Sequence, residues 1–222
     1  MSESPPRVVL ASASPRREEL LHALLDRFAI EPSDVPEELG RDAVEDAIRL
    51  ARAKTAAVAA RIDSNKIVLG ADTIVFDEHG SYGKPTDAAD AARVLRLLRG
   101  RTHSVVTAVA LAFEGRLLDD HVVSRVTLTD LDDAAVDAYV ASGRPLDKAG
   151  AYAIQDEDVP TVAKVVGCHC AVIGMALWRV HYLLELAGVH SRKPDATFAR
   201  CISCPGRNAP PSGRPGDRHP RP

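Results

Sequence analysis

Two long stretches rich in β-branched residues follow one another with only two residues between them, and this arrangement constrains the fold most. Residues 103–113 and 116–129 are predicted strands, and the intervening Glu114-Gly115 is typical of a tight β-hairpin. On both sides of this hairpin, short apolar runs alternate with amphipathic stretches of helical period. The pattern indicates a mixed α/β protein.

The other predicted elements alternate along the chain, and several helices end at a glycine. The predicted strands cover residues 7–11, 28–32, 67–76 and 162–166. The predicted helices cover residues 15–27, 42–61, 87–98, 132–142 and 175–187. No internal repeat is visible, so one α/β domain is expected.

Charge is distributed unevenly over the 222 residues. The net charge is −3, but residues 189–222 carry six Arg and one Lys against two Asp, so this segment is +5 and the first 188 residues are −8. An acidic body binds duplex DNA poorly, and 4% aromatic residues are few for stacking on single strands. Apolar runs are too short to cross a membrane, and no apolar signal core follows Met1. We expect a cytoplasmic protein that binds neither membrane nor nucleic acid.

The C-terminal segment 189–222 holds seven of the 15 prolines and has no periodic apolar pattern. Such a composition buries too little apolar surface to offset the entropy of ordering, so the segment is predicted to be mostly disordered. The domain is therefore expected over residues 1–188, followed by a Pro/Arg-rich tail. That tail either contacts a partner or is a tolerated extension.

The segment 10–17 joins a predicted strand to a helix and contains two hydroxyl groups and two arginines. Ser14 is a favourable N-cap, and Pro15 suits the first helical position. Arg16 and Arg17 then lie in the first turn, where the helix dipole repels cations. Two cations beside free N–H groups are favourable when a phosphate binds there, although two solvated surface arginines are the alternative.

Asp72 follows a buried apolar run and the small residues Gly70-Ala71. A carboxylate in such a place commonly holds a divalent cation or polarises water, whereas an Asx turn that only ends the strand is the alternative. Lys84, between Gly and Pro before a predicted helix, also suits a phosphate. Gln155 can read a base edge or ribose and His103 can act as an acid or base, but both have ordinary local roles as alternatives.

The chain has four cysteines, in a Cys-x-Cys pair and a Cys-x-x-Cys pair separated by 30 residues: Cys168, Cys170, Cys201 and Cys204. The second spacing is typical of zinc ligands, but the first is not, and the second pair lies in the predicted tail. Ordinary reduced thiols are the favoured interpretation. A structural zinc site, with His169 nearby as a further ligand, is the alternative.

Seven short motifs, taken in order, resemble the Maf family of nucleoside triphosphate pyrophosphatases. They span about residues 7–188 and comprise Leu10–Arg17, Glu37, Lys54, Ala71-Asp72-Thr73, Gly83-Lys84-Pro85, Gly100–His103 and Asp147–Gln155. The resemblance implies a single elongated α/β domain with a mixed sheet, flanking helices and a central cleft. It also implies a metal-dependent enzyme, commonly a homodimer, that splits a nucleoside triphosphate into the monophosphate and pyrophosphate.

The resemblance also assigns roles to individual residues. Asp72, Glu37 and Lys84 are the expected catalytic residues, and Asp72 and Glu37 would hold Mg²⁺ or Mn²⁺. Together with Lys84, three further cations would clamp the triphosphate. The residues expected to bind substrate are Ser12, Arg16, Arg17, Lys54, Thr73 and Gln155.

Asp72-Thr73 and Ile154-Gln155 resemble the branch of the family that prefers dTTP and UTP. Pyrimidine triphosphates, including modified ones, are therefore the expected substrates, in a house-cleaning role that some relatives link to cell-division arrest. The chain departs from the family pattern at 156–158 and 168–170, and at Ala176 in place of a usual Pro, which puts base preference and turnover in question. The alternative is a catalytically weak nucleotide-binding regulator of cell division.

Overall fold

The predicted hairpin lies at the centre of a seven-stranded mixed sheet. In the computed structural model, which describes residues 7–156 and 158–209, β5 (Thr102–Phe113) pairs antiparallel with β6 (Arg116–Leu128) over its whole length. Glu114 and Gly115 have φ values of 49° and 71°, the left-handed conformation that suits a two-residue hairpin turn. The hairpin prediction is confirmed.

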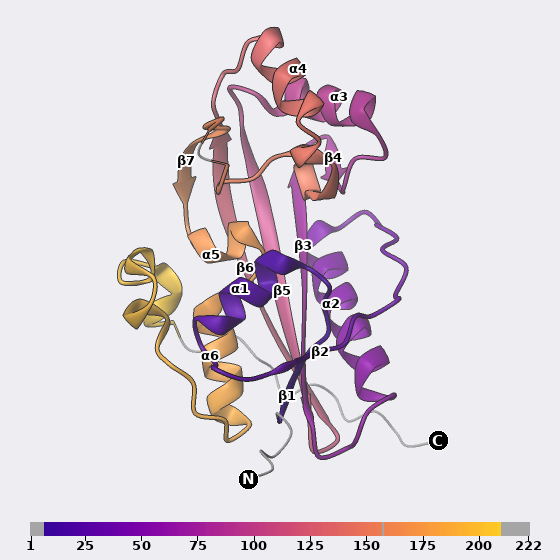
Figure 1. Cartoon of the computed structure of the whole chain (residues 1–222), viewed down its shortest axis with the longest axis vertical. Helices are drawn as coiled ribbons and strands as arrows, with labels where there is room; N and C mark the ends of the chain where they lie inside the picture. Colours follow the sequence, from indigo (N-terminus) through magenta and orange to yellow (C-terminus); the bar gives the residue numbers. More distant parts are fainter. Residues whose placement is uncertain (1–6, 157, 210–222) are drawn as a thin grey trace.

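The remaining strands extend the sheet on both sides of the hairpin (Figure 1). β3 (Ile67–Asp77) pairs antiparallel with β5, and β1 (Val8–Leu10) and β2 (Ala29–Ile30) follow in parallel. β7 (Val162–Val166) pairs with β6, and the short β4 (Gly80–Tyr82) pairs with β3. The resulting order, β2-β1-β3-β5-β6-β7, makes a mixed sheet, as expected.

Helices cover both faces of the sheet and one of its ends (Figure 1). One face of β3 and β5 packs against α2, and the other packs against α1, α5 and α6, while α3 and α4 gather at the far end. Their bounds are α1 Pro15–His22, α2 Ala43–Ala59, α3 Ala88–Leu98, α4 Asp133–Ala141, α5 His169–Ile173 and α6 Leu177–Leu186. The 3-10 helices η1 Arg144–Asp147 and η2 Ala149–Ala151 follow α4.

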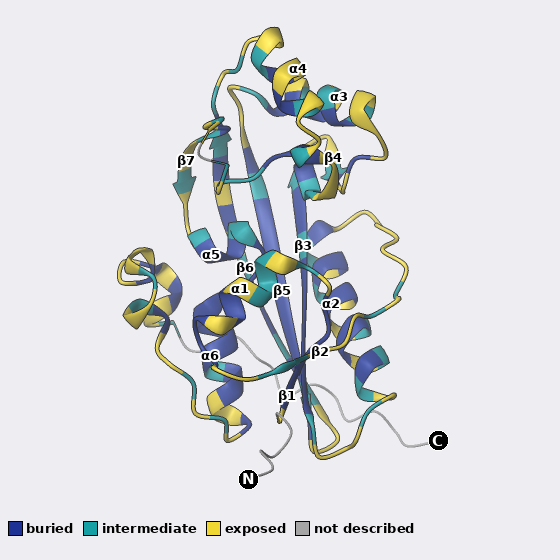
Figure 2. Cartoon of the chain, viewed as in Figure 1, coloured by how far each residue is buried: buried dark blue, intermediate teal, exposed yellow. Residues whose placement is uncertain are grey.

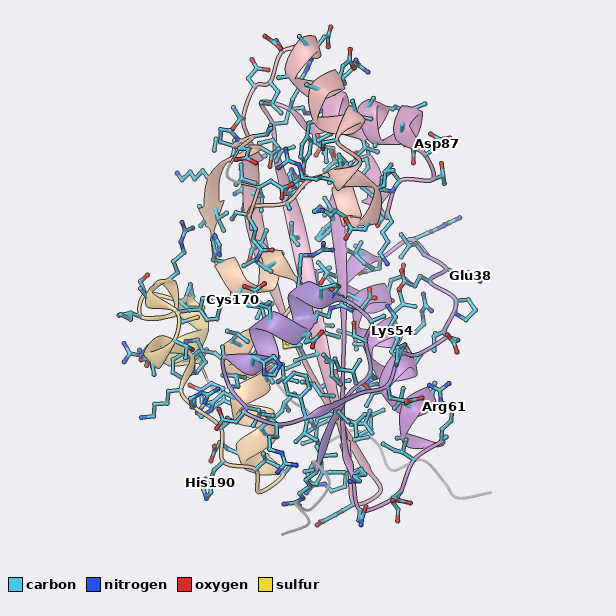
Figure 3. All side chains as sticks on the ribbon, viewed as in Figure 1. Glu38, Lys54, Arg61, Asp87, Cys170 and His190 are labelled. Atoms are coloured by element: carbon cyan, nitrogen blue, oxygen red, sulfur yellow. The ribbon has the colours of Figure 1, made fainter. Side chains whose placement is uncertain are left out.

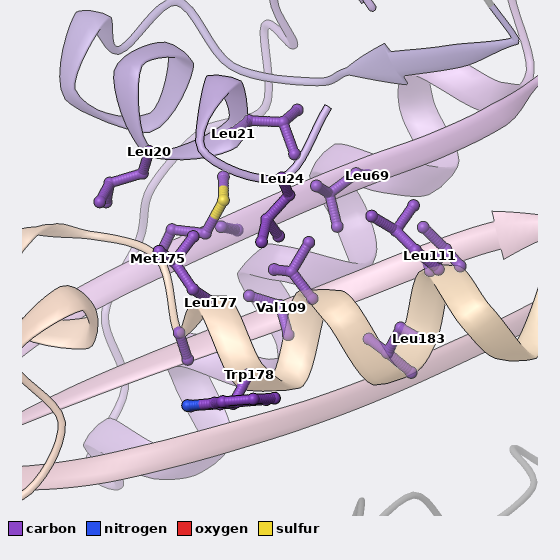
Figure 4. Close-up of a cluster of buried hydrophobic side chains, with 14 of the residues drawn as sticks. Leu20, Leu21, Leu24, Leu69, Val109, Leu111, Met175, Leu177, Trp178 and Leu183 are labelled. Carbon is purple, nitrogen blue, oxygen red and sulfur yellow. The ribbon is translucent and has the colours of Figure 1, made fainter. Parts of the chain in front are cut away.

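A shared apolar core joins α1 and α6 to the sheet (Figure 4). Leu20 and Leu24, from α1 and the turn after it, meet Leu69 and Leu111 of the strands and Leu183 of α6, and none is more than 2% exposed. Full burial of one such side chain stabilises the fold by about 1.5–3 kcal/mol. The strands β3 and β5 are buried along most of their length (Figure 2), so they form a rigid support for the residues they carry.

Alternation along β3 decides which helices its side chains face. Gly70 faces α2, where an added Cβ would lie 2.3 Å from Thr55 Oγ1, so the close approach of α2 requires a glycine. Asp72, two residues further, faces α2 as well and bonds to a lysine of that helix. Thr73 points to the opposite face, toward α5.

The edge of β3 is interrupted in the middle of the strand. β1 pairs with it up to Leu69, and β4 begins to pair with it only at Val75. Between these points, no strand among the described residues covers that edge of β3. Asp72 and Thr73 lie in this gap, where a ligand can approach the strand.

The C-terminal segment differs from the predicted disorder over residues 189–209, while residues 210–222 lie outside the described part. Three short 3-10 helices form here: η3 Pro194–Ala196, η4 Ala199–Cys201 and η5 Pro205–Arg207. Trp178 Nε1 of α6 donates to the Cys201 carbonyl at 3.1 Å, and Arg192 Nε donates to the Ala23 carbonyl at 3.1 Å. The composition averaged over 189–222 concealed this packed part, because its contacts come from single buried residues rather than from a periodic apolar face.

The predicted helices and strands are largely present, with differences at their ends. α1 ends at His22 rather than at residue 27, and Leu24 and Leu25 are buried in the turn beyond it. α5 and β4 were not predicted, because so few residues show no period. Among the described residues, no helix is both long and apolar enough to span a membrane.

Candidate active site

A cavity of about 640 Å³ opens beside the gap on β3. Its size is typical of small-molecule sites. The segments that line it are far apart in the sequence and include α1, α2, β3, the loop before α3 and the loop after η2. All nine residues to which the family resemblance assigns a role line it: Ser12, Arg16, Arg17, Glu37, Lys54, Asp72, Thr73, Lys84 and Gln155.

Lys54 of α2, which Figure 3 labels, joins the two predicted catalytic carboxylates. Its Nζ donates to Asp72 Oδ1 and to Glu37 Oε1, both at 2.5 Å. Lys54 and Asp72 are each only 5% exposed, so water screens their attraction weakly. A buried ammonium is tolerated only when it is paired, and here it has a carboxylate on either side.

The charges around Glu37 favour its ionised form. Partial burial alone would raise the pKa of Glu37. The hydrogen bond from Lys54 and the charges of Lys54, Lys84 and Arg17 together outweigh this effect and lower the pKa. Glu37 therefore remains a carboxylate well into the acid range.

Arg17 is held in place by two neutral acceptors. Its Nη1 donates to Ser12 Oγ at 3.2 Å, and its Nε donates to the Gly174 carbonyl at 3.1 Å. Burial lowers the pKa of Arg17, while the charges of Asp72 and Glu37 act in the opposite direction. The charges of both carboxylates thus act on the guanidinium, which forms no ion pair at contact distance with any residue that the structure describes.

Arg16, next to it in α1, reaches across to η1. Its Nη1 donates to Asp147 Oδ2 at 2.8 Å, and Lys148 Nζ donates to Asp147 Oδ1 at 2.7 Å. Two cations therefore share one carboxylate that is 61% exposed. This ion pair links the N-terminal helix to the segment after α4, and both border the cavity.

The other predicted residues are less tightly held. Thr73 Oγ1 shares a hydrogen bond of 2.9 Å with Thr107 Oγ1, whose hydroxyl also donates to the Ala171 carbonyl at 2.7 Å. Lys84 is exposed, and within the described part of the chain it forms no hydrogen bond or ion pair at contact distance, although its charge acts on Glu37. Gln155 is exposed at the cavity. These side chains are free to meet a ligand.

Two local expectations need correction. The Asx-turn alternative for Asp72 is wrong, because Asp72 lies within β3 and ends no strand. His103 does not bond locally, because its Nε2 bonds the Tyr152 hydroxyl at 2.7 Å, and burial lowers the pKa of His103 to about 4. The surroundings of both residues are determined by contacts between segments that are distant in the chain, and local sequence patterns do not show such contacts.

The described geometry agrees with one known family. The family model described as Maf-like protein matches residues 7–187. The chain belongs to the Maf family. The match covers all nine predicted site residues and ends before η3.

Curated relatives of this Maf protein extend the comparison. A dTTP/UTP pyrophosphatase of Thermomicrobium roseum is 42% identical over 216 residues, which cover 95% of this chain and 99% of the relative. One of Geobacter sulfurreducens is 46% identical over 178 residues, or 78% of this chain and 93% of the relative. One of Escherichia coli O157:H7 is 46% identical over 191 residues, or 84% and 95%. Because the Thermomicrobium alignment covers 95% of this chain, it extends through residues 189–207.

Two residues of the Maf site were missed by the sequence analysis. Gly174, whose carbonyl holds Arg17, has a φ of 138°, which only glycine adopts readily. Tyr152, at the cavity wall, is 6% exposed and bonded to His103. A glycine between α5 and α6 was the available signal for the first, whereas nothing local marks the second.

The carboxylates of the Maf site suit a divalent cation that is shared with a substrate. Among the described residues, no group of three or more His, Cys, Asp and Glu is arranged to hold a metal ion. Asp72 and Glu37 offer two carboxylates on one lysine, which is a partial set of oxygen ligands. Mg²⁺ is commonly held by one or two carboxylates together with phosphate oxygens and water, so the residues present fit such an ion.

Proposed function

We propose that this Maf protein hydrolyses nucleoside triphosphates, dTTP and UTP in particular, to the nucleoside monophosphate and pyrophosphate. The observation that carries the proposal is the convergence of three carboxylates and five cations on one cavity of suitable size. The relatives are named dTTP/UTP pyrophosphatases, which supports both the proposed reaction and the two proposed pyrimidine substrates.

The cations of the cavity are suited to a triphosphate. Lys84 is exposed, and among the described residues the side chain of Arg17 is bonded only to neutral acceptors, so both charges are available to phosphate oxygens. Arg16 lies at the start of α1, where backbone N–H groups and the helix dipole also favour an anion. Neutralising the charge on the phosphates lowers the barrier to attack at phosphorus.

Asp72 is proposed to accept the proton of the attacking water. The water oxygen forms a bond to the α-phosphorus, the bond from that phosphorus to the bridging oxygen breaks, and pyrophosphate leaves with the electron pair. Asp72 Oδ1 is bound by Lys54, which leaves Oδ2 to take the proton. Because Lys54 also bonds Glu37, it orients both carboxylates rather than serving only as a phosphate ligand.

Asp72 and Glu37 are also the residues proposed to hold a divalent cation, Mg²⁺ or Mn²⁺. When bound, such an ion supplies charge neutralisation on the phosphates and a lower pKa for water.

Base selection is assigned to Gln155 and Thr73. The Gln155 amide offers both a donor and an acceptor, as recognition of a pyrimidine edge requires, and it lies exposed at the cavity. Asp156, beside it, accepts a hydrogen bond from Tyr139 of α4, so the loop departs from the family pattern but is anchored at this residue. Glu157 of the same departure lies outside the described residues.

The test is product identification from a panel of nucleoside triphosphates with Mg²⁺ or Mn²⁺. We expect pyrophosphate and monophosphate from dTTP and UTP, and loss of this release in Asp72→Asn. Asp77→Asn is the matched control, since Asp77 lies on the same strand, bonds Tyr82 and does not line the cavity. Release of orthophosphate instead would overturn the reaction type.

Tight nucleotide binding without turnover in the wild type would favour a nucleotide-binding regulator of cell division instead. The homodimer implied by the family resemblance stays a prediction, which light scattering on the purified chain tests.

A further inference from the structure

All four cysteines of the chain meet in one buried cluster outside the cavity. Cys168 and Cys170 lie at the start of α5, Cys201 ends η4 and Cys204 precedes η5. Cys170 Sγ lies 3.5 Å from Cys201 Sγ, and the Cys168 thiol bonds that of Cys204. Each cysteine is 8% exposed or less. Figure 3 labels Cys170 beside the C-terminal segment.

The spacing of the sulfurs is closer to that of metal ligands than to that of a disulfide. Zn–S bonds of about 2.3 Å in a tetrahedron put the sulfurs about 3.8 Å apart. A disulfide needs about 2.05 Å. The Cys170–Cys201 separation of 3.5 Å lies near the first value.

Two backbone N–H groups donate to sulfurs of the cluster, while thiol–thiol hydrogen bonds and burial raise the pKa of Cys168 and Cys170. The Gly206 N–H donates to the Cys204 sulfur, and the Ala171 N–H donates to the Cys168 sulfur. The charge of Arg179 also acts on Cys204. Hydrogen bonds to ligand sulfurs and a nearby cation are the outer groups that stabilise a negatively charged metal–thiolate centre.

The segment 189–207 is also of a kind that a bound metal ion commonly stabilises. It contains three 3-10 helices of three residues each and no longer element. Ile202 is 55% exposed, and the apolar side chains that the segment turns inward are few: its two cysteines, Pro194, and the partly buried Val189 and Phe198. Small units without a sufficient core are commonly held by a metal or by disulfides.

We propose that Cys168, Cys170, Cys201 and Cys204 bind one structural zinc ion that fastens residues 189–207 to α5. Each thiol releases its proton to solvent as its Zn–S bond forms, and no atom changes its oxidation state. With four cysteine ligands there is no open coordination position, so the ion has no catalytic role. The proposal does not depend on the proposed function, since none of the four cysteines lines the cavity.

The thiols do not yet surround one point, as no group of three or more ligands among the described residues forms a ready metal site. Zinc binding therefore requires the four side chains to turn inward. Replacing two thiol–thiol hydrogen bonds with four Zn–S bonds supplies the free energy for this movement.

The first test measures bound zinc in the full chain, purified under reducing conditions and supplied with zinc, by elemental mass spectrometry. We expect about one zinc per chain in the wild type, and none in the double variant Cys201→Ser/Cys204→Ser. Ser203→Ala is the matched control, because Ser203 is exposed between the two cysteines, and it should retain the metal. Equal zinc in the wild type and the double variant would overturn the proposal.

The second test uses the wild type alone, so it holds even if the double variant does not fold. Co²⁺ added to the metal-free chain should produce the intense sulfur-to-metal absorption of tetrahedral thiolate coordination, and zinc should displace it. Its absence, with four titratable thiols in the unfolded chain, would mean ordinary reduced cysteines. Loss of those thiols without a reductant would mean two disulfides. Either result overturns the zinc site and leaves the proposed function untouched.

Discussion

Two clusters of reactive side chains, one partly and one wholly buried, lie in the described part of this molecule, and they are built in opposite ways. In the cavity, the Lys54 ammonium lies between the carboxylates of Asp72 and Glu37, so unlike charges satisfy one another. In the cysteine cluster, four alike thiols have chiefly one another as partners. In the first cluster the charges balance one another before any ligand binds. In the second, the proposed metal ion is what would attach residues 189–207 firmly to α5. Burial alone therefore does not tell whether a polar cluster needs a ligand.

The supports of the two clusters differ as well. Asp72 lies on β3, which is paired along β5, and Lys54 lies in the 17-residue helix α2. The cysteines lie on α5, which has five residues, and on turns of three residues. A site on long elements is positioned by the fold itself, so changes in the cavity should affect turnover, and changes in the cysteine cluster should affect stability.

The largest effect is expected from Asp72→Asn. Removing the proton acceptor should lower kcat by about 10³-fold, in the range for a general base. Lys54 keeps its bond to Glu37, so the melting temperature should stay close to that of the wild type. Steady-state kinetics and thermal melts measured side by side check this separation. If Asp72→Asn lost stability but retained turnover, the expectation that changes in the cavity affect turnover rather than stability would be wrong.

Lys54→Met tests whether the charged cluster supports itself. The change leaves Asp72, 5% exposed, facing Glu37 without the cation between them. Loss of one partner of a buried pair costs about 3–5 kcal/mol in the free energy of unfolding, which urea denaturation measures. Adding Asp72→Asn to Lys54→Met should recover part of this loss. An unchanged stability in Lys54→Met would show that the cluster is not held by its charges.

Arg16→Gln tests a partner at the rim of the cavity. The ion pair with Asp147 is largely open to water, so its loss should cost less than about 1 kcal/mol of stability. Because the same guanidinium is assigned to the triphosphate, KM should rise about tenfold, which corresponds to about 1.4 kcal/mol of binding. A KM equal to that of the wild type would remove Arg16 from the clamp.

The smallest effect concerns pH. The pKa of Glu37 is lowered in the folded protein, so its charge stabilises the fold above the unfolded value of about 4.3, and this contribution disappears as the pH falls through the folded pKa. The difference in unfolding free energy between wild type and Glu37→Gln should therefore favour the wild type at pH 7 and shrink below about pH 4. A difference that stays constant with pH would argue against the ionic contact with Lys54.

Much of the fold could be predicted because its elements are long and periodic. The β5–β6 hairpin, α3 and β7 appear almost at their predicted bounds. α5, with five residues, is too short to show a period. The packing of 189–209 was missed because the prediction used the composition of the whole segment, in which a few buried cysteines are outnumbered by prolines and charged residues.

Part of the candidate site was predicted from motifs whose chemistry is local, such as two arginines in the first turn of a helix, whereas Glu37 and Lys54 were expected only from the family resemblance. Gly174 and Tyr152 were missed because their roles arise from contact with Arg17 and His103, which are remote in the chain.

The amino-acid sequence by itself determined which charged and thiol groups exist, the order of strands and helices, and the family. Only the tertiary structure decided that Lys54 lies between Glu37 and Asp72, and that Cys168 and Cys170 meet Cys204 and Cys201. The reason is physical. Helix and strand preferences act between neighbours, whereas these contacts depend on strand register, on the gap in the edge of β3 and on how closely α2 approaches Gly70.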